Sequence, residues 1–183
     1  HLEMSTVFFN GSWRMYYRTF RFAGGECPFP TGIALATSVD GDTWTAFNSG
    51  LPLEGLATVP ACPTSAGTVS VWRYAPSVAV DGASLRMANE SRATLVANGR
   101  AFNRVDVASS PDGVTWSGDH TIISPGVVGA WNEEVGTPDL VRDGGVWKVG
   151  FHANRPSQVV RALAIGGGSF ADPYTVLGTV VGP

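Results

Sequence analysis

The sequence predicts an all-β fold of the β-propeller type, built from three four-stranded antiparallel blades. Two repeats favour this class: a strand–turn–strand unit occurs three times, and a Ser-x-Asp-Gly turn followed by Trp occurs twice. In addition, no run of about ten residues shows the 3.6-residue period of an amphipathic helix. Repeated groups of four short strands are the signature of propeller blades. The 183 residues suffice for one domain with a hydrophobic core.

The two Ser-x-Asp-Gly turns are the strongest local signal. They read Ser38-Val39-Asp40-Gly41-Asp42-Thr43-Trp44 and Ser110-Pro111-Asp112-Gly113-Val114-Thr115-Trp116. Asp-Gly between two apolar runs predicts a hairpin, because Gly adopts positive φ without a Cβ clash. The Ser and Asp side chains bond nearby backbone amides and build the turn. We expect both Trp side chains to lie in the core.

A second hairpin precedes each of these turns and recurs a third time. Its turns are Asn10-Gly11, Asp81-Gly82 and Asp143-Gly144. Trp13 precedes Leu85 by the same spacing that separates the two Ser-x-Asp-Gly turns, which makes coincidence improbable. In the third unit the later turn has decayed to Gly-rich residues 166–170. The predicted blades span about 5–48, 75–121 and 136–180 of a single domain, 4–183, and residues 1–3 resemble a cloning remnant.

Three blades raise the question of closure. Propellers close with four to eight blades, and an unclosed set leaves sheet edges and apolar flanks exposed. We therefore expect completion by a second copy of the chain, a longer parent propeller, or an open form with protected edges. The competing fold is a β-sandwich with duplicated hairpins.

Composition limits the partners. The net charge is −3, with eleven Arg and only Lys148 as lysine, and no basic run indicates nucleic acid or an anionic membrane surface. No apolar run of transmembrane length and no signal peptide is evident, so localisation stays open. Cys27 and Cys62 could form a disulfide or remain free thiols. No metal-ligand spacing or phosphate-binding loop is present, so we expect no cofactor and no metal.

Several segments resemble a known group of enzymes. Tyr16-Tyr17, Ala36-Thr37-Ser38 with the turn that follows, and Thr137-Pro138-Asp139-Leu140-Val141 are similar to the five-bladed propeller glycoside hydrolases of families 43, 32, 62 and 68. The Ser-x-Asp-Gly turn also resembles the Asp-box of sialidases. The resemblance implies a carbohydrate ligand, and members of the group are often secreted. It also implies three carboxyl groups on inner strands: a base or nucleophile, an Asp that tunes its pKa, and a general-acid Glu.

The resemblance carries over only in part. The inner-strand starts align as Thr6, Ser77 and Asp139, and of these only Asp139 is a carboxylate, in the place of the tuning Asp. Glycoside cleavage requires one protonated and one ionised carboxyl group facing each other across the sugar. We expect Asp139 as base or tuning residue and Glu134 or Glu133 as the acid.

Other candidates surround this set. Trp131 would be the sugar platform, and the aligned second-strand residues Arg18, Glu90 and His152 would bind substrate. Each has a structural alternative: Asp139 as a strand cap, the glutamates as a solvated loop, and the second-strand residues as blade surface. The sequence therefore predicts a carbohydrate-active protein that hydrolyses or recognises glycosides. The alternative is a non-catalytic sugar-binding or scaffold propeller derived from a truncated hydrolase.

Overall fold

The computed structural model of the chain describes residues 3–19, 31–58, 69–95, 100–155 and 158–181. Cys27 and Cys62, and with them the question of a disulfide, lie outside these residues. The described parts form strands and turns with one short 3-10 turn, η1 (Phe47–Gly50), and they contain no α-helix. Accordingly, no helix that could cross a membrane is found among them.

The strands form three sheets, each ordered along the chain with antiparallel neighbours. Blade one contains β1 (Met4–Phe9), β2 (Ser12–Thr19), β3 (Thr31–Ser38) and β4 (Thr45–Ala46), and β5 (Ala57–Thr58) also pairs with β3. Blade two contains β6 (Val69–Asp81), β7 (Ser84–Leu95), β8 (Arg100–Ser110) and β9 (Ser117–Ile123). Blade three contains β10 (Glu134–Asp143), β11 (Val146–Arg155), β12 (Gln158–Ile165) and β13 (Thr175–Val181).

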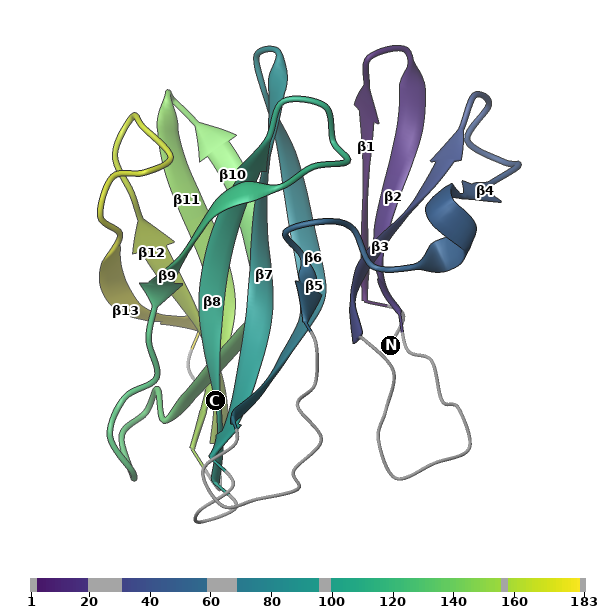
Figure 1. Cartoon of the computed structure of the whole chain (residues 1–183). Helices are drawn as coiled ribbons and strands as arrows, with labels where there is room; N and C mark the ends of the chain where they lie inside the picture. The colour runs from purple at the N-terminus through teal and green to yellow at the C-terminus, as the bar shows by residue number, and fades with distance from the viewer. Residues whose placement is uncertain (1–2, 20–30, 59–68, 96–99, 156–157, 182–183) are drawn as a thin grey trace, which may run out of the picture.

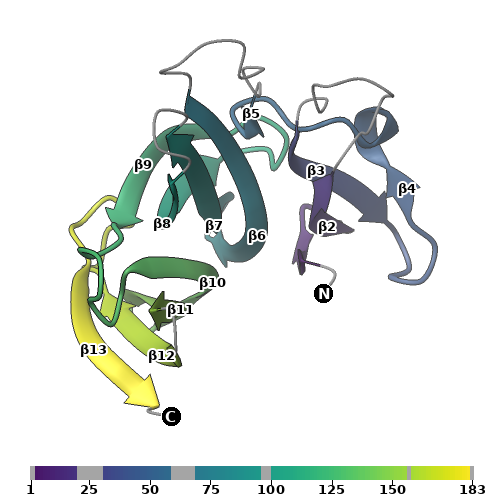
Figure 2. The ribbon, with the colours of Figure 1, turned by 90° about the horizontal axis from the view of Figure 1, so that it is seen from below.

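The blades stand side by side in chain order (Figure 1) and fan out around a concave side (Figure 2). The strands β6 and β10 lie on the concave side of the arc, whereas β4, β9 and β13 lie on its outside. This arrangement confirms the predicted all-β class with four-stranded antiparallel blades of the propeller type.

The hairpin turns fix the register of each first strand. Asn10 and Gly11 both have positive φ (49° and 78°), as do Gly144 and Gly145 (58° and 80°), which is the pattern of a type I′ turn. In blade two only Gly82 has positive φ (61°), as a type II′ turn requires at its first central residue.

This register corrects one predicted alignment. Phe9 pairs with Ser12, and Asp81 pairs with Ser84. Asn10 is therefore a turn residue, while Asp81 still belongs to its strand. As a consequence Ser5, and not Thr6, is the residue of blade one that corresponds to Ser77 and Asp139.

The two Ser-x-Asp-Gly turns have the same hydrogen bonds. Asp112 Oδ1 accepts the backbone N–H groups of residues 114 and 115, each at 2.8 Å, and Ser110 Oγ accepts that of Gly113 at 2.7 Å. Asp40 makes the equivalent bonds to residues 42 and 43. These backbone N–H groups lower the pKa of Asp40 to about 2 and also lower the pKa of Asp112.

The Trp residues after these turns differ in burial. Trp116 is only 3% exposed and its ring meets that of Tyr16 edge-on at 5.5 Å. Trp44 is half-buried, and its ring N–H donates to the carbonyl of Gly41 at 2.9 Å. The expectation of a core position is therefore wrong for Trp44. The difference arises because Trp116 faces blade one, whereas the described chain places no blade against the corresponding face of Trp44.

The hydrophobic core lies between the blades, in two clusters that we call seam one and seam two. Seam one joins blades one and two through Phe9, Tyr16, Ile33, Leu35, Leu53, Leu56, Val78, Leu85, Met87, Ala108 and Trp116. Seam two joins blades two and three through residues that include Val105, Val107, Leu140, Trp147, Val149 and Phe151. Since no backbone ladder crosses from one blade to the next among the described strands, side-chain packing holds these blades together.

Candidate functional site

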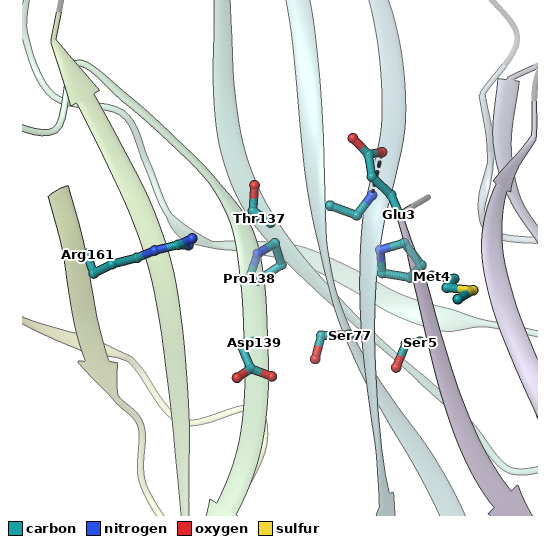
Figure 3. A pocket seen from close by; sticks show the side chains of 10 residues that line it. Glu3, Met4, Ser5, Ser77, Thr137, Pro138, Asp139 and Arg161 are labelled. Atoms are coloured by element: carbon teal, nitrogen blue, oxygen red, sulfur yellow. Dashed lines mark hydrogen bonds between the residues drawn. The ribbon is translucent and has the colours of Figure 1, made fainter. Parts of the chain in front are cut away.

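A pocket of about 400 Å³ lies where the three first strands converge. It is lined by Glu3, Met4, Ser5, Ala75, Pro76, Ser77, Thr137, Pro138, Asp139 and Arg161. Figure 3 shows Asp139, Ser77 and Ser5 in a row across β10, β6 and β1, with Arg161 reaching toward Thr137. Each blade thus contributes to one polar pocket.

Two strained kinks shape the pocket wall. Ala75 and Thr137, each followed by proline, have positive φ values of 47° and 44°, and the strand register shifts around both. Positive φ is uncommon for residues other than glycine and costs about 1–3 kcal/mol. Such strain persists only where the surroundings enforce it, and it is concentrated at functional sites.

Glutamate side chains hold both kinks. Glu3 Oε2 accepts the backbone N–H of Ala75 at 3.2 Å, and Glu90 Oε2 accepts that of Thr137 at 2.8 Å. A Cβ atom at Gly136 would lie 2.2 Å from Glu90 Oε2, so a side chain there would displace the carboxylate. Glu90 therefore supports the pocket from behind its wall.

Glu90 is 3% exposed. Burial raises the pKa of Glu90, although hydrogen bonds with Tyr74 and with the Thr137 amide oppose the shift. Burial and the Glu90 charge together raise the pKa of Tyr74. The guanidinium of Arg18 lies over the Tyr74 ring at 4.7 Å and forms an ion pair with Glu3 at 3.6 Å. Arg18 and Glu90 therefore meet through Tyr74 as one network beneath the pocket.

A repeated hydrogen bond crosses each seam at the pocket. Ser5 Oγ accepts the backbone N–H of Val78 at 2.9 Å, and Ser77 Oγ accepts that of Leu140 at 2.8 Å. Asp139 holds the same position in blade three. Its side chain is exposed to the pocket, and within the described residues no donor reaches its carboxylate.

The remaining predicted residues lie away from the pocket lining. Glu133 Oε2 accepts the N–H of Gly129 at 2.7 Å within the loop before β10, and Trp131 packs against seam two. Glu134 starts β10, opposite Asn154. His152 is half-buried; burial and nearby Arg161 lower its pKa, and the charge of Glu134 opposes them. Only Asp139 of the predicted set lines the pocket.

Sequence reasoning did not identify Arg161, Ser5 or Thr137 as pocket residues. Arg161 sits on β12 opposite His152, and only the register of β11 with β12 reveals that it reaches the pocket. Ser5 was missed because the sequence alignment placed Thr6, one residue later, opposite Ser77 and Asp139. Within the described part of the chain, no three His, Cys, Asp or Glu side chains are grouped so that they could hold a metal ion.

Comparison with solved structures reveals similar folds among glycoside hydrolases. One is Zg3597, a family 117 glycoside hydrolase of Zobellia galactanivorans, with a TM-score of 0.65 and 18% identity over 96% of this chain. Another is BmSUC1, a family 32 β-fructofuranosidase of Bombyx mori, with a TM-score of 0.66 and 15% identity over 98%. A family 32 glycoside hydrolase of Bifidobacterium adolescentis has a TM-score of 0.72 and 10% identity over 99%.

This chain spans 54%, 34% and 37% of those three proteins, respectively. No family model matches the sequence, and no curated protein matches it. At these identities the likeness concerns the fold. The chain therefore shares the fold of roughly half, or a third, of a propeller glycoside hydrolase.

Proposed function

We propose that the pocket between β1, β6 and β10 binds a carbohydrate, and that the chain is a glycoside-recognising propeller unit. The observation that carries the proposal is the exposed carboxylate of Asp139 among hydroxyl and guanidinium groups, in a pocket whose wall contains the kinks within β6 and β10. The folds of the glycoside hydrolases described above support the same ligand class.

The lining suits a sugar chemically. A sugar hydroxyl both donates and accepts hydrogen bonds; Asp139 accepts, Arg161 donates, and Thr137 does either. Pro76, Pro138 and Met4 add apolar surface for the C–H faces of a sugar ring. Ligand sites commonly combine apolar walls with a few such polar groups.

Hydrolysis is the second candidate, favoured by the strained wall and by the carboxylate exposed at it. It needs a second carboxyl group across the sugar, about 5–5.5 Å away for retention or about 6.5–9.5 Å for inversion. Glu134 or Glu133 would be the acid, with Trp131 as platform, but none of the three lines the pocket. The other carboxylate of the lining, Glu3, already holds the Ala75 amide and Arg18. Recognition is therefore the better-supported function.

Glycan-array binding and hydrolysis of a panel of chromogenic aryl-glycosides test both candidates. We expect the wild-type chain to retain at least one glycan, and Asp139→Asn to weaken that binding about tenfold, or ~1.4 kcal/mol. Asp143→Asn is the matched control, because Asp143 lies on the same strand, exposed, and outside the pocket.

Absence of glycan binding, or equal binding by Asp139→Asn, contradicts the proposal. Aryl-glycoside turnover that Asp139→Asn and Glu134→Gln both abolish would establish hydrolysis instead of recognition alone. Turnover that survives both substitutions would exclude Asp139 and Glu134 as its catalytic pair.

A further inference from the structure

The pocket row contains an acceptor whose partner is missing. At seam one Ser5 accepts the amide of Val78, and at seam two Ser77 accepts the amide of Leu140. Asp139 is the third member of the row, and the described chain offers it no donor. The repeat predicts what that donor should be: the backbone N–H of the corresponding residue in a following blade.

Blade one carries that corresponding residue. Val78 pairs with Met87 and Leu140 pairs with Val149; by the same register Thr6 pairs with Met15. Thr6 therefore occupies in β1 the position from which Val78 and Leu140 donate across their seams. By this correspondence the amide of Thr6 would donate across the side of blade one against which the described residues place no other blade.

That uncovered side of blade one has the chemistry of a seam. Trp13 is 38% exposed, whereas the residues in its place in the other two blades, Leu85 and Trp147, are fully buried in seams one and two. Trp44, the half-buried twin of Trp116, belongs to the same side. Blade one thus presents one half of an unformed seam.

Blade three presents the other half. Val141 corresponds by register to Val7 and Ala79, which pack against seams one and two, yet Val141 is 49% exposed. Leu163 corresponds to Leu35 and Val107, both of which are buried in the seams. A third seam would use the same positions and would join the free side of blade three to the free side of blade one. Arg161 stands there in the place of the buried residues Ile33 and Val105, so this seam would be more polar than the other two beside the pocket.

We propose that a second copy of this chain forms that seam, twice, in a two-fold dimer that closes a ring of six blades. Asp139 of each copy accepts the backbone N–H of Thr6 in the other copy through one carboxylate oxygen and leaves the second oxygen facing the pocket. Six blades lie within the range in which propellers close, and a head-to-tail contact that closes in two steps is compatible with point symmetry. Each sheet flank is then covered, as stable blades require.

The assembly places both copies' pocket residues around one axis. The proposal is independent of carbohydrate binding, because the seam consists of protein groups alone. Dimer formation and carbohydrate binding are separable by substitution of Asp139, because Ser5 and Ser77 show that a serine hydroxyl suffices as acceptor for an amide in the first strand of the next blade.

The experiment measures mass in solution by sedimentation and light scattering over a range of concentrations. We expect twice the 19.2 kDa of one chain, with a dissociation constant raised at least about tenfold by Asp139→Ala and changed less than about threefold by Asp139→Ser. Asp139→Ser should still lose glycan binding, so failure of the sugar proposal and failure of the dimer are distinguishable.

Two charge substitutions test the two faces. Trp13→Glu and Val141→Glu should each give monomers that keep the far-ultraviolet circular dichroism of the parent. Val39→Glu is the control: Val39 is 86% exposed, and its twin Pro111 stays exposed beside the formed seam one. A wild-type chain that is monomeric at every concentration overturns the proposal, as does a dimer that Trp13→Glu and Val141→Glu leave intact.

Discussion

Tyr16 offers the sharpest test of how the blades are held together. Its ring is fully buried in seam one, and its hydroxyl donates to the carbonyl of Gly113 at 2.9 Å. Tyr16→Phe removes this bond and the hydrogen bond between the hydroxyl and Arg14 of the same blade, and it keeps the ring that packs edge-on against Trp116. The substitution therefore removes a polar contact between blades one and two and leaves the packing of the ring in place.

The expected loss follows from that geometry. A typical hydrogen bond contributes about 0.5–1.5 kcal/mol net, and a buried acceptor left without a partner costs about 1–3 kcal/mol. In the wild-type chain Arg14 donates to the neighbouring carbonyl of Asp112, whereas Tyr16 is the donor to Gly113. We expect Tyr16→Phe to lower the free energy of unfolding by about 1–3 kcal/mol. With a urea m-value of about 2 kcal/mol/M, the midpoint falls by about 0.5–1.5 M.

Urea unfolding at one fixed protein concentration measures this loss. Tyr17→Phe is the control, because Tyr17 is the adjacent residue, is half-buried, and has no hydroxyl partner among the described residues; we expect a change within about 0.5 kcal/mol. Equal midpoints for wild type and Tyr16→Phe, or equal losses for both variants, would show that the hydroxyl of Tyr16 does not stabilise seam one.

The pH dependence gives a second readout. Burial raises the pKa of Tyr16 from 10.0 to about 12. The folded state therefore keeps the phenol proton longer than the unfolded state does. The stability it contributes is complete below pH 10 and is lost as the pH rises through about 12. Tyr16→Phe should lack this part of the alkaline decline.

Three further outcomes are expected. Gly55 and Gly11 have similar φ (79° and 78°), but a Cβ at Gly55 would lie 2.0 Å from the Trp116 carbonyl oxygen, whereas one at Gly11 would meet nothing within 4 Å. In urea unfolding, Gly11→Ala should therefore lower the free energy of unfolding by about 1–2 kcal/mol and Gly55→Ala by clearly more. Equal losses would contradict the contact between Gly55 and Trp116. His152 should titrate by NMR below its ordinary 6.5, and Arg161→Gln should move that midpoint upward; an unmoved midpoint would exclude the Arg161 charge as a cause. Because burial raises the pKa of Glu90 above 4.5, the free energy of unfolding of the wild type should fall as the pH rises from 4.5 through the folded pKa. Glu90→Gln should remove that pH dependence, and an unchanged dependence would exclude Glu90 as its source.

The blades were predictable because their signals are local. An Asp-Gly turn with its Ser is specified within a few residues, and the structure forms both Ser-x-Asp-Gly turns with the same hydrogen bonds. The burial of the Trp after each turn was not predictable in the same way. It depends on whether another blade covers the face, and two identical turns can therefore place Trp44 and Trp116 in different environments.

The site was predictable only where one residue carries its own signal. Asp139 follows a recognisable Thr-Pro pair, and it does line the pocket. Arg161 lies on β12, two strands away from β10 in the same blade, and whether its side chain reaches the pocket depends on the exact pairing of Arg161 with His152. The alignment that chose Thr6 equated two glycine turns, yet Asn10 tolerates positive φ and shifts the turn by one residue. Such one-residue differences exchange the faces of a strand.

Because the backbone ladders of the described strands stay within each blade, side chains between the blades set how far apart the first strands lie. Leu85 and Trp147 stand at the hairpin ends of their blades and separate each blade from its neighbour. A bulkier or smaller side chain at either position would change the angle between that blade and its neighbour. The distance between Ser5, Ser77 and Asp139 would then change without any substitution among them. The width of the proposed carbohydrate pocket would thus depend on residues between the blades that do not line it.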